Sequence, residues 1–291
     1  MSLNRPVNRS WNRRQVLAVG LAAAGAGAAL PAWAEGGRPL RILVGFPPGG
    51  GTDAIARALA DKLKDRLGVP VVVDNRPGAG GQIAAQALKA APADGSTVFL
   101  THDHTISILP QVVRNAGFDP ERDFVPAGGF ATFVNCFAVA GGTPANTFAE
   151  YLDWVRKAGG GKSAVGIPAP ASTPEFLVRL LGERYRLDLV AAPYRGSAPL
   201  IGDLLGQQIP AGVASVQDFI EQHRAGKLRV LAVLGGQRQA ALPQLPTFAE
   251  LGLPGFEDTP YYGFYAPANT PRGFIDTFSA ALSKVVSAPA M

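Results

Sequence analysis

The chain has 291 residues, of which 47% are hydrophobic and 17% charged, so it is long enough for one large domain or two lobes and is not a charge-rich disordered tail. Its formal net charge is +5, but residues 1–34 hold four arginines and no acid, which leaves 23 basic against 22 acidic residues in the remainder. This balance removes the electrostatic reason to expect nucleic-acid binding.

The first 34 residues have the pattern of an export signal. Arg13 and Arg14 precede an apolar stretch over 16–30, and Ala32-Trp33-Ala34 follows as a small-x-small cleavage site. The paired arginines and the Gly/Ala-rich apolar stretch favour the twin-arginine route, and the general secretory route stays open. The stretch is short for a membrane span of ~20 residues. We expect cleavage after Ala34 and a soluble protein in the periplasm.

Beyond the signal, short apolar runs typical of strands alternate with helical patterns. The first block predicts strands at 40–46, 69–75 and 96–102 and helices at 53–67 and 82–90. A second block, from about residue 130, predicts strands at 133–140, 162–168, 187–194, 207–214 and 228–235, and helices at 147–157, 174–184, 197–205 and 217–224. The segment 254–271 is expected to return the chain to the first block, with a last helix near 272–287. The strands of the first block are apolar on both faces, which indicates a parallel sheet covered on both sides, so the fold class is α/β with two lobes.

The loop after the first strand reads "GFPPGGGTDAIARALADKL". Gly49-x-Gly51-x-x-Ala54 satisfies the dinucleotide fingerprint, and Asp74 closes the next strand as that fold requires. An exported NAD(P)-dependent oxidoreductase that uses this loop is therefore one hypothesis. Against it, Pro47 and Pro48 lengthen the turn, and Asp53 in the first helical turn would repel a phosphate. A loop whose backbone amides bind a carboxylate and a tight turn without ligand both remain open.

His102-Asp103-His104 is the strongest metal candidate, since residues i and i+2 of a strand point the same way. Only His223 remains elsewhere and no third ligand is evident, so polar groups at a strand end are favoured over a metal-binding receptor. Cys136 is the sole cysteine, which excludes an internal disulfide, and its apolar neighbours predict a buried, inert thiol.

Two strand-to-helix junctions in the second block present helix N-termini. In "APYRGSAPLIGDLL" we expect Ser197 to cap a helix and Arg195 to anchor an anion. In "PAPASTPEFLVRLL" Ser172 or Thr173 is expected to be the cap, followed by Pro174 in the first turn. Helix N-termini from both lobes suit an acidic ligand better than they suit catalysis.

Four blocks taken together resemble the tripartite tricarboxylate transporter substrate-binding proteins, also called Bordetella uptake gene (Bug) receptors. They are "RPLRILVGFPPGGGTDAIARALADKLKDRLGVPVVVDNRPGAGG", "APYRGSAPLIGDLLGQQI", "AGKLRVLAV" and "LPTFAELGLPGFE", in that order along nearly the whole mature chain. The resemblance implies a type II-like periplasmic binding protein with an interlobe ligand cleft, no catalysis and no cofactor. It implies lobe 1 from 35–136 plus 258–291, lobe 2 from 137–257, and hinges near 130–140 and 255–265.

The resemblance further implies a small carboxylate ligand, a two-component membrane permease as partner and a monomeric receptor. The family's binding loops fall here on Pro47, Pro48, Gly49, Gly50, Gly51, Asp53, Thr101, His102, His104, Thr105, Ser172, Thr173, Tyr194, Arg195, Gly196 and Ser197, with Ser215 as a further contact.

Three features depart from the family pattern. Ala214-Ser215 stands where many members have an Asp-Asn pair, and His102-Asp103-His104 stands where members have small polar residues. Members usually continue for a few dozen residues beyond the point where this chain stops, so lobe 1 is expected to be C-terminally incomplete. The histidines are expected either to tune the pocket or to make binding sensitive to pH.

Overall fold

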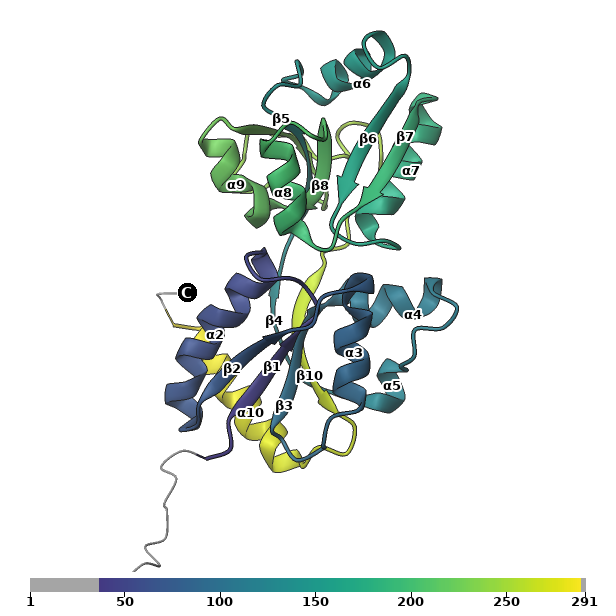
Figure 1. The fold of residues 1–291 in the computed structure, drawn as a ribbon. Coiled ribbons are helices and arrows are strands. Elements are labelled where there is room, and N and C mark those ends of the chain that lie inside the picture. The colour runs from purple at the N-terminus through teal and green to yellow at the C-terminus, as the bar shows by residue number, and fades with distance from the viewer. Residues whose placement is uncertain (1–36, 289–291) are drawn as a thin grey trace, which may run out of the picture. The chain divides into compact units, whose positions relative to one another are not determined.

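A computed structural model describes residues 37–288 (Figure 1). The expected export signal, with its cleavage site after Ala34, lies outside the described residues. Within 37–288 no helix combines the length and apolar character of a membrane span.

The first sheet, sheet A, has five strands in the order β2-β1-β3-β10-β4. Its strands are β1 (Leu40–Val44), β2 (Val71–Asn75), β3 (Thr97–His102), β4 (Phe124–Thr132) and β10 (Tyr261–Pro267). Strands β1, β2 and β3 are parallel, as the sequence predicts, whereas β10 runs antiparallel to both β3 and β4. The aromatic segment near 261 therefore returns the chain to the first sheet as expected.

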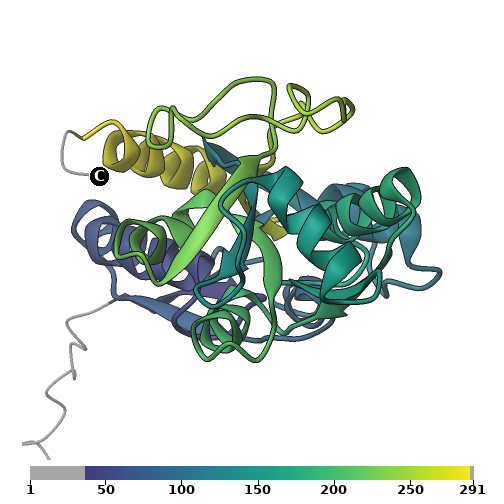
Figure 2. The same cartoon turned by 90° about the horizontal axis from the view of Figure 1, so that it is seen from above.

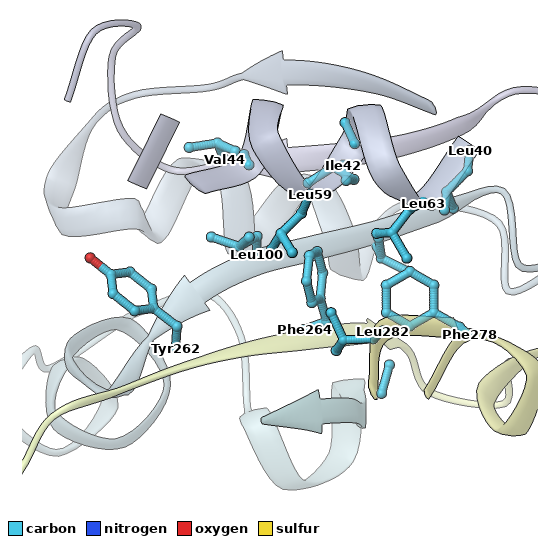
Figure 3. Packing of buried hydrophobic residues seen from close by; sticks show 14 of the residues in the cluster. Leu40, Ile42, Val44, Leu59, Leu63, Leu100, Tyr262, Phe264, Phe278 and Leu282 are labelled. Carbon is cyan, nitrogen blue, oxygen red and sulfur yellow. The ribbon is translucent and has the colours of Figure 1, made fainter. Parts of the chain in front are cut away.

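Helices cover both faces of sheet A because its buried strands carry apolar residues on both sides. On one face Leu40, Ile42 and Val44 of β1 pack against α2 (Gly51–Leu67) and α10 (Arg272–Val286), as the close view in Figure 3 shows. These two helices lie side by side (Figure 2). On the other face Leu43 packs against α3 (Gln82–Lys89).

Short elements complete the first lobe. They are η1 (Ala79–Gly81), the π-helical turn η2 (His104–Ile108), α4 (Leu109–Val112) and α5 (Pro120–Asp123). The turn η2 begins two residues after β3 ends, so His104 does not continue the strand.

The second sheet, sheet B, also has five strands, in the order β7-β6-β8-β5-β9. Its strands are β5 (Asn135–Ala140), β6 (Lys162–Ile167), β7 (Asp188–Pro193), β8 (Ala211–Ser215) and β9 (Leu228–Val233). The helices are α6 (Phe148–Lys157), α7 (Thr173–Tyr185), α8 (Ser197–Leu205) and α9 (Val216–Arg224). Helices α6 and α7 pack on one face and α8 and α9 on the other. Cys136 is fully buried in this sheet, and burial raises the pKa of its thiol.

The chain passes between the sheets twice, from β4 to β5 and, after β9, back to β10. The boundary expected at 136/137 falls inside β5, so the first crossing comes earlier, between Thr132 and Asn135. The physical reason is that β5 is buried along its whole length, paired with β8 on one side and β9 on the other.

Candidate functional site

A cavity that is partly open to solvent is lined by residues that flank both sheets. Its lining residues are Phe46, Pro47, Gly50, Thr52, His102, Asp103, His104, Phe133, Asn135, Pro168, Ala169, Ser172, Thr173, Pro174, Ser197, Ser215, Asp218, Pro260 and Tyr262. Many of them directly follow the carboxyl ends of β1, β3, β6 and β8, where open α/β sheets place their ligand sites.

The N-termini of three helices reach this cavity. Gly50 precedes α2, Thr173 opens α7, and Ser197 opens α8. The first N–H groups of a helix have no partner within it and carry partial positive charge. Together these ends make the cavity a favourable place for a carboxylate.

The expected caps differ in detail from the structure. Ser172 is the N-cap residue of α7, but its hydroxyl donates to Ala169 O at 2.7 Å rather than capping the helix. Gly196, with φ +101°, is the N-cap of α8, so Ser197 is the first helical residue and not the cap. A serine one position further along points its hydroxyl away from the helix's own amides, toward Asp218.

Asp218, in the first turn of α9, bonds to both halves of the cavity wall. Its Oδ1 accepts from the Gly51 amide at 3.1 Å and from Ser197 Oγ at 2.9 Å. Its Oδ2 accepts from Ser215 Oγ. The Gly51 bond joins the α2 N-terminus beside sheet A to α9 beside sheet B.

Asp53 holds the glycine loop in place. This buried carboxylate accepts from the Gly49 amide at 3.0 Å, from Arg57 Nε at 3.0 Å and from Asn75 Nδ2 at 2.9 Å. Burial by itself raises the pKa of Asp53, but the bonds from Arg57, Gly49 and Asn75 outweigh it and hold that pKa below its ordinary value. Asp53 thus closes the turn before α2. The amides of Gly49 and Gly51 are both bonded to protein carboxylates.

An aromatic cluster forms one wall of the cavity. The His102 ring stacks on Phe46, with ring centroids 4.8 Å apart, and meets Phe133 and Tyr262 edge-on, at 5.8 Å each. Tyr262 accepts a hydrogen bond from Gln217 Nε2 at 3.2 Å, a second link between the two sheets. Burial, reinforced by the charge of Asp218, raises the pKa of Tyr262. This wall presents flat apolar faces together with one phenol.

The two histidines of the cavity are neutral at ordinary pH. Burial, with a smaller effect of His104, lowers the pKa of His102 to about 3, and burial also lowers the pKa of His104. His104 Nε2 lies 3.1 Å from Pro170 O, so that nitrogen carries the proton. Asp103 differs, since burial raises the pKa of its carboxyl to about 6. Among residues 37–288 no group of three His, Cys, Asp or Glu side chains is placed to hold a metal ion.

A neighbouring cavity is lined by a second set of the expected residues. Tyr194, Arg195 and Gly196 line it together with Gly78–Gly80. Tyr194 donates to Asp203 Oδ2 at 2.7 Å, and burial together with that bond raises the pKa of Tyr194 to about 12. The expected anion anchor Arg195 is exposed and does not line the main cavity.

Of the residues expected from sequence, about half meet in the main cavity. They are Pro47, Gly50, His102, His104, Ser172, Thr173, Ser197 and Ser215. Pro48, Gly49, Gly51, Asp53, Thr101 and Thr105 line neither cavity. Thr105 instead donates to Gly80 O at 2.8 Å, which fixes the turn beside it.

Asp218, Phe133 and Tyr262 are among the cavity residues that sequence reasoning missed. Asp218 looks like an ordinary first-turn acid of α9, and Phe133 and Tyr262 belong to the segments that join the sheets. The only sequence signal was the aromatic run "PYYGFY", which predicted a returning strand but not that one tyrosine faces a cavity.

Comparisons with known proteins converge on one family. Residues 55–291 match the family model described as the tripartite tricarboxylate transporter family receptor. Protein BugT of Bordetella pertussis is 34% identical over 291 residues, covering 96% of this chain and 87% of BugT.

Solved structures agree. The periplasmic binding protein BugD has 32% identity and a TM-score of 0.80, covering 87% of this chain and 84% of BugD. A Rhodopseudomonas palustris protein, Rpa4515 with adipate, has 29% identity and a TM-score of 0.81, at the same coverages. These similarities support two-lobed solute-binding proteins and give no support to the oxidoreductase alternative.

Proposed function

Since the chain belongs to the tripartite tricarboxylate transporter receptor family, we propose that it binds a small organic acid in the cavity between its two sheets. The observation that carries this proposal is the meeting of the N-termini of α2, α7 and α8 at one cavity. These helix ends carry partial positive charge, and those of α7 and α8 supply free amide donors, without a cationic side chain.

Membership of this family and the sequence of residues 1–34 both support export of the receptor to the periplasm. We propose that the monomer delivers its acid to a two-component membrane permease and carries out no chemistry on it. The adipate in the related Rpa4515 structure supports a carboxylate as the ligand class.

A thermal-shift screen of small carboxylates on the full mature chain tests the proposal, with calorimetry on each hit. We expect at least one acid to raise the melting temperature by several degrees, since ligand at 100 times its Kd stabilises the folded state by about 2.7 kcal/mol. NAD and NADP serve as the contrasting ligands. A shift with a dinucleotide and none with any acid would refute the proposal.

Paired variants then place the binding site. Thr173→Val removes a hydroxyl at the cavity end of α7, whereas Thr277→Val removes one from the exposed side of α10. We expect the first to weaken the acid's affinity roughly tenfold, because a hydrogen bond to a charged group is worth about 1.5–3 kcal/mol. The second should leave the affinity unchanged.

A further inference from the structure

The main cavity contains two acids and lacks a cation. Asp103 and Asp218 line it, and none of the described residues around it is Lys or Arg. The exposed Arg195 lines the neighbouring cavity instead. A ligand bound here therefore meets a fixed carboxylate without a compensating basic side chain in the wall.

The hydroxyls of the three serines in the wall are committed as donors. Ser197 and Ser215 both donate to Asp218, and Ser172 donates to Ala169 O. A hydroxyl has one proton to give, so these serines offer a ligand only acceptor lone pairs. A ligand carboxylate therefore cannot use these three hydroxyls and must find its donors among the backbone amides and other polar side chains of the wall, such as Thr173.

Those amides are also partly used. The Gly51 amide of α2 is bonded to Asp218, and the Gly49 amide before it is bonded to Asp53. Pro174 and Pro199 have no N–H, so the first amides without an intrahelical partner are that of Thr173 in α7 and those of Ser197 and Ala198 in α8. These helix ends can hold one ligand carboxylate, whereas the corner where α2 meets α9 already contains a carboxylate of the protein.

Asp218 itself has room for one more partner. A carboxylate offers about four lone-pair positions, and the bonds from Gly51, Ser197 and Ser215 use three of them. The remaining position, on Oδ2, suits a donor such as an ammonium, amide or hydroxyl. A second ligand carboxylate near it would face like charge in a poorly solvated corner.

We propose that Asp218 makes this receptor select acids with a single carboxylate and a hydrogen-bond-donating far end, and reject dicarboxylates. The proposal rests on the proposed function, and it names the ligand subclass of the same cavity. It sets this chain apart from the related protein that was solved with adipate.

Matched ligands test it on the full mature chain by calorimetry. One series is adipate, hexanoate and 6-aminohexanoate, and a shorter series is succinate, butyrate and 4-aminobutyrate. For wild type we expect the tightest ligand to be an amino acid of one series, at least tenfold tighter than the dicarboxylate of the same series. Asp218→Asn keeps the size of the side chain and removes the charge. The ratio of the affinity for the amino acid to the affinity for the dicarboxylate should therefore fall at least tenfold in this variant.

The control is Asp203→Asn, which removes another lobe 2 carboxylate that bonds to Tyr194 outside the main cavity. It should leave the ratio unchanged. If Asp218→Asn does not fold, the ratio of the two affinities in wild type alone tests the proposed selectivity. Wild type binding a dicarboxylate tighter than its amino analogue would overturn the inference while leaving the proposed function intact. If none of the six acids binds to either protein, the inference fails, and the carboxylate screen described above decides on the proposed function.

Discussion

At the scale of single residues, Asp103 rather than a histidine is the group of the cavity that titrates near neutral pH. His102 stays neutral down to about pH 3 because burial lowers its pKa, and His104 is shifted in the same direction. The carboxyl of Asp103 has its pKa raised to about 6 by burial. The pH sensitivity expected from the histidines is therefore assigned to their neighbour.

We predict that the receptor binds an acid more tightly at pH 5 than at pH 7.5. Below its pKa of about 6 Asp103 is protonated and neutral, whereas above it the ionised carboxylate repels an anionic ligand. The expected gain on acidification is roughly three- to tenfold, since a coupling of one pKa unit corresponds to tenfold. Calorimetric titration of the best acid across pH 5–8 measures it.

Two variants separate Asp103 from its neighbours. Asp103→Asn should bind with little dependence on pH over this range, whereas His102→Gln should keep the wild-type profile. The ligand must be ionised throughout, so a carboxylate with an ordinary pKa is used. If the pH dependence of the affinity disappears in His102→Gln and persists in Asp103→Asn, the pH dependence does not come from Asp103.

Sequence reasoning found the cavity residues that carry a local signal and missed those that depend on tertiary placement. Gly50, Ser172, Thr173 and Ser197 were predictable because glycines, serines and threonines mark strand-to-helix junctions. Asp218 was not, because an acid in the first turn of a helix already has a local explanation in the helix dipole. Asp218 gains its role in the cavity only because the fold brings Gly51 and Ser197 within hydrogen-bonding distance of it.

At the scale of elements, the long helices were predicted well because their apolar residues recur with the helical period. Strand β4 (Phe124–Thr132) was not predicted. It lies at the edge of sheet A, contains Pro126, Gly128 and Gly129, and pairs with β10 through register shifts, so its pattern is irregular. Strand β8 begins at Ala211 rather than 207 because Gln207, with φ +56°, belongs to the preceding turn.

The junction before α8 gives an element-scale prediction. Gly196 has φ +101°, and a Cβ added there would lie 2.8 Å from Pro47 Cδ in the loop after β1. Gly196→Ala must therefore strain the backbone and also push two loops of the cavity apart. We expect it to cost more than the roughly 1–3 kcal/mol of backbone strain alone and to weaken acid binding at least tenfold.

Gly49→Ala is the matched control. Gly49 has φ +87°, but a Cβ there meets nothing within 4 Å. Chemical denaturation and calorimetry on both variants should show backbone strain in each and a large loss of affinity only in Gly196→Ala. If both variants lose the same affinity for the acid, the contact between residue 196 and Pro47 does not control binding.

At the scale of the whole molecule, polar contacts join the two sheets across the cavity. The Gly51 amide bonds to Asp218, and Gln217 bonds to Tyr262. We predict that Asp218→Ala loosens this closed arrangement in the absence of added acid. A compact chain of this length has a radius of gyration of about 18–19 Å, and we expect the variant's to rise by roughly 1 Å.

Small-angle X-ray scattering measures that change. Asp203→Ala removes a carboxylate whose partner, Tyr194, belongs to the same sheet B lobe, so it should not alter the radius. A radius for Asp218→Ala identical to that of wild type would show that the carboxylate does not hold the sheets together.

The central place of β10 has a consequence for the order in which the two lobes mature during synthesis. Strands β5–β9 come from one continuous stretch, so sheet B has all its parts once residue 233 is made. Sheet A does not, because β10 lies between β3 and β4 and is made last among the strands. Until residues 261–267 emerge, β3 and β4 have no partner between them and their edges stay open to wrong pairing. The lobe whose first strand is synthesised first is therefore the lobe whose sheet is completed last.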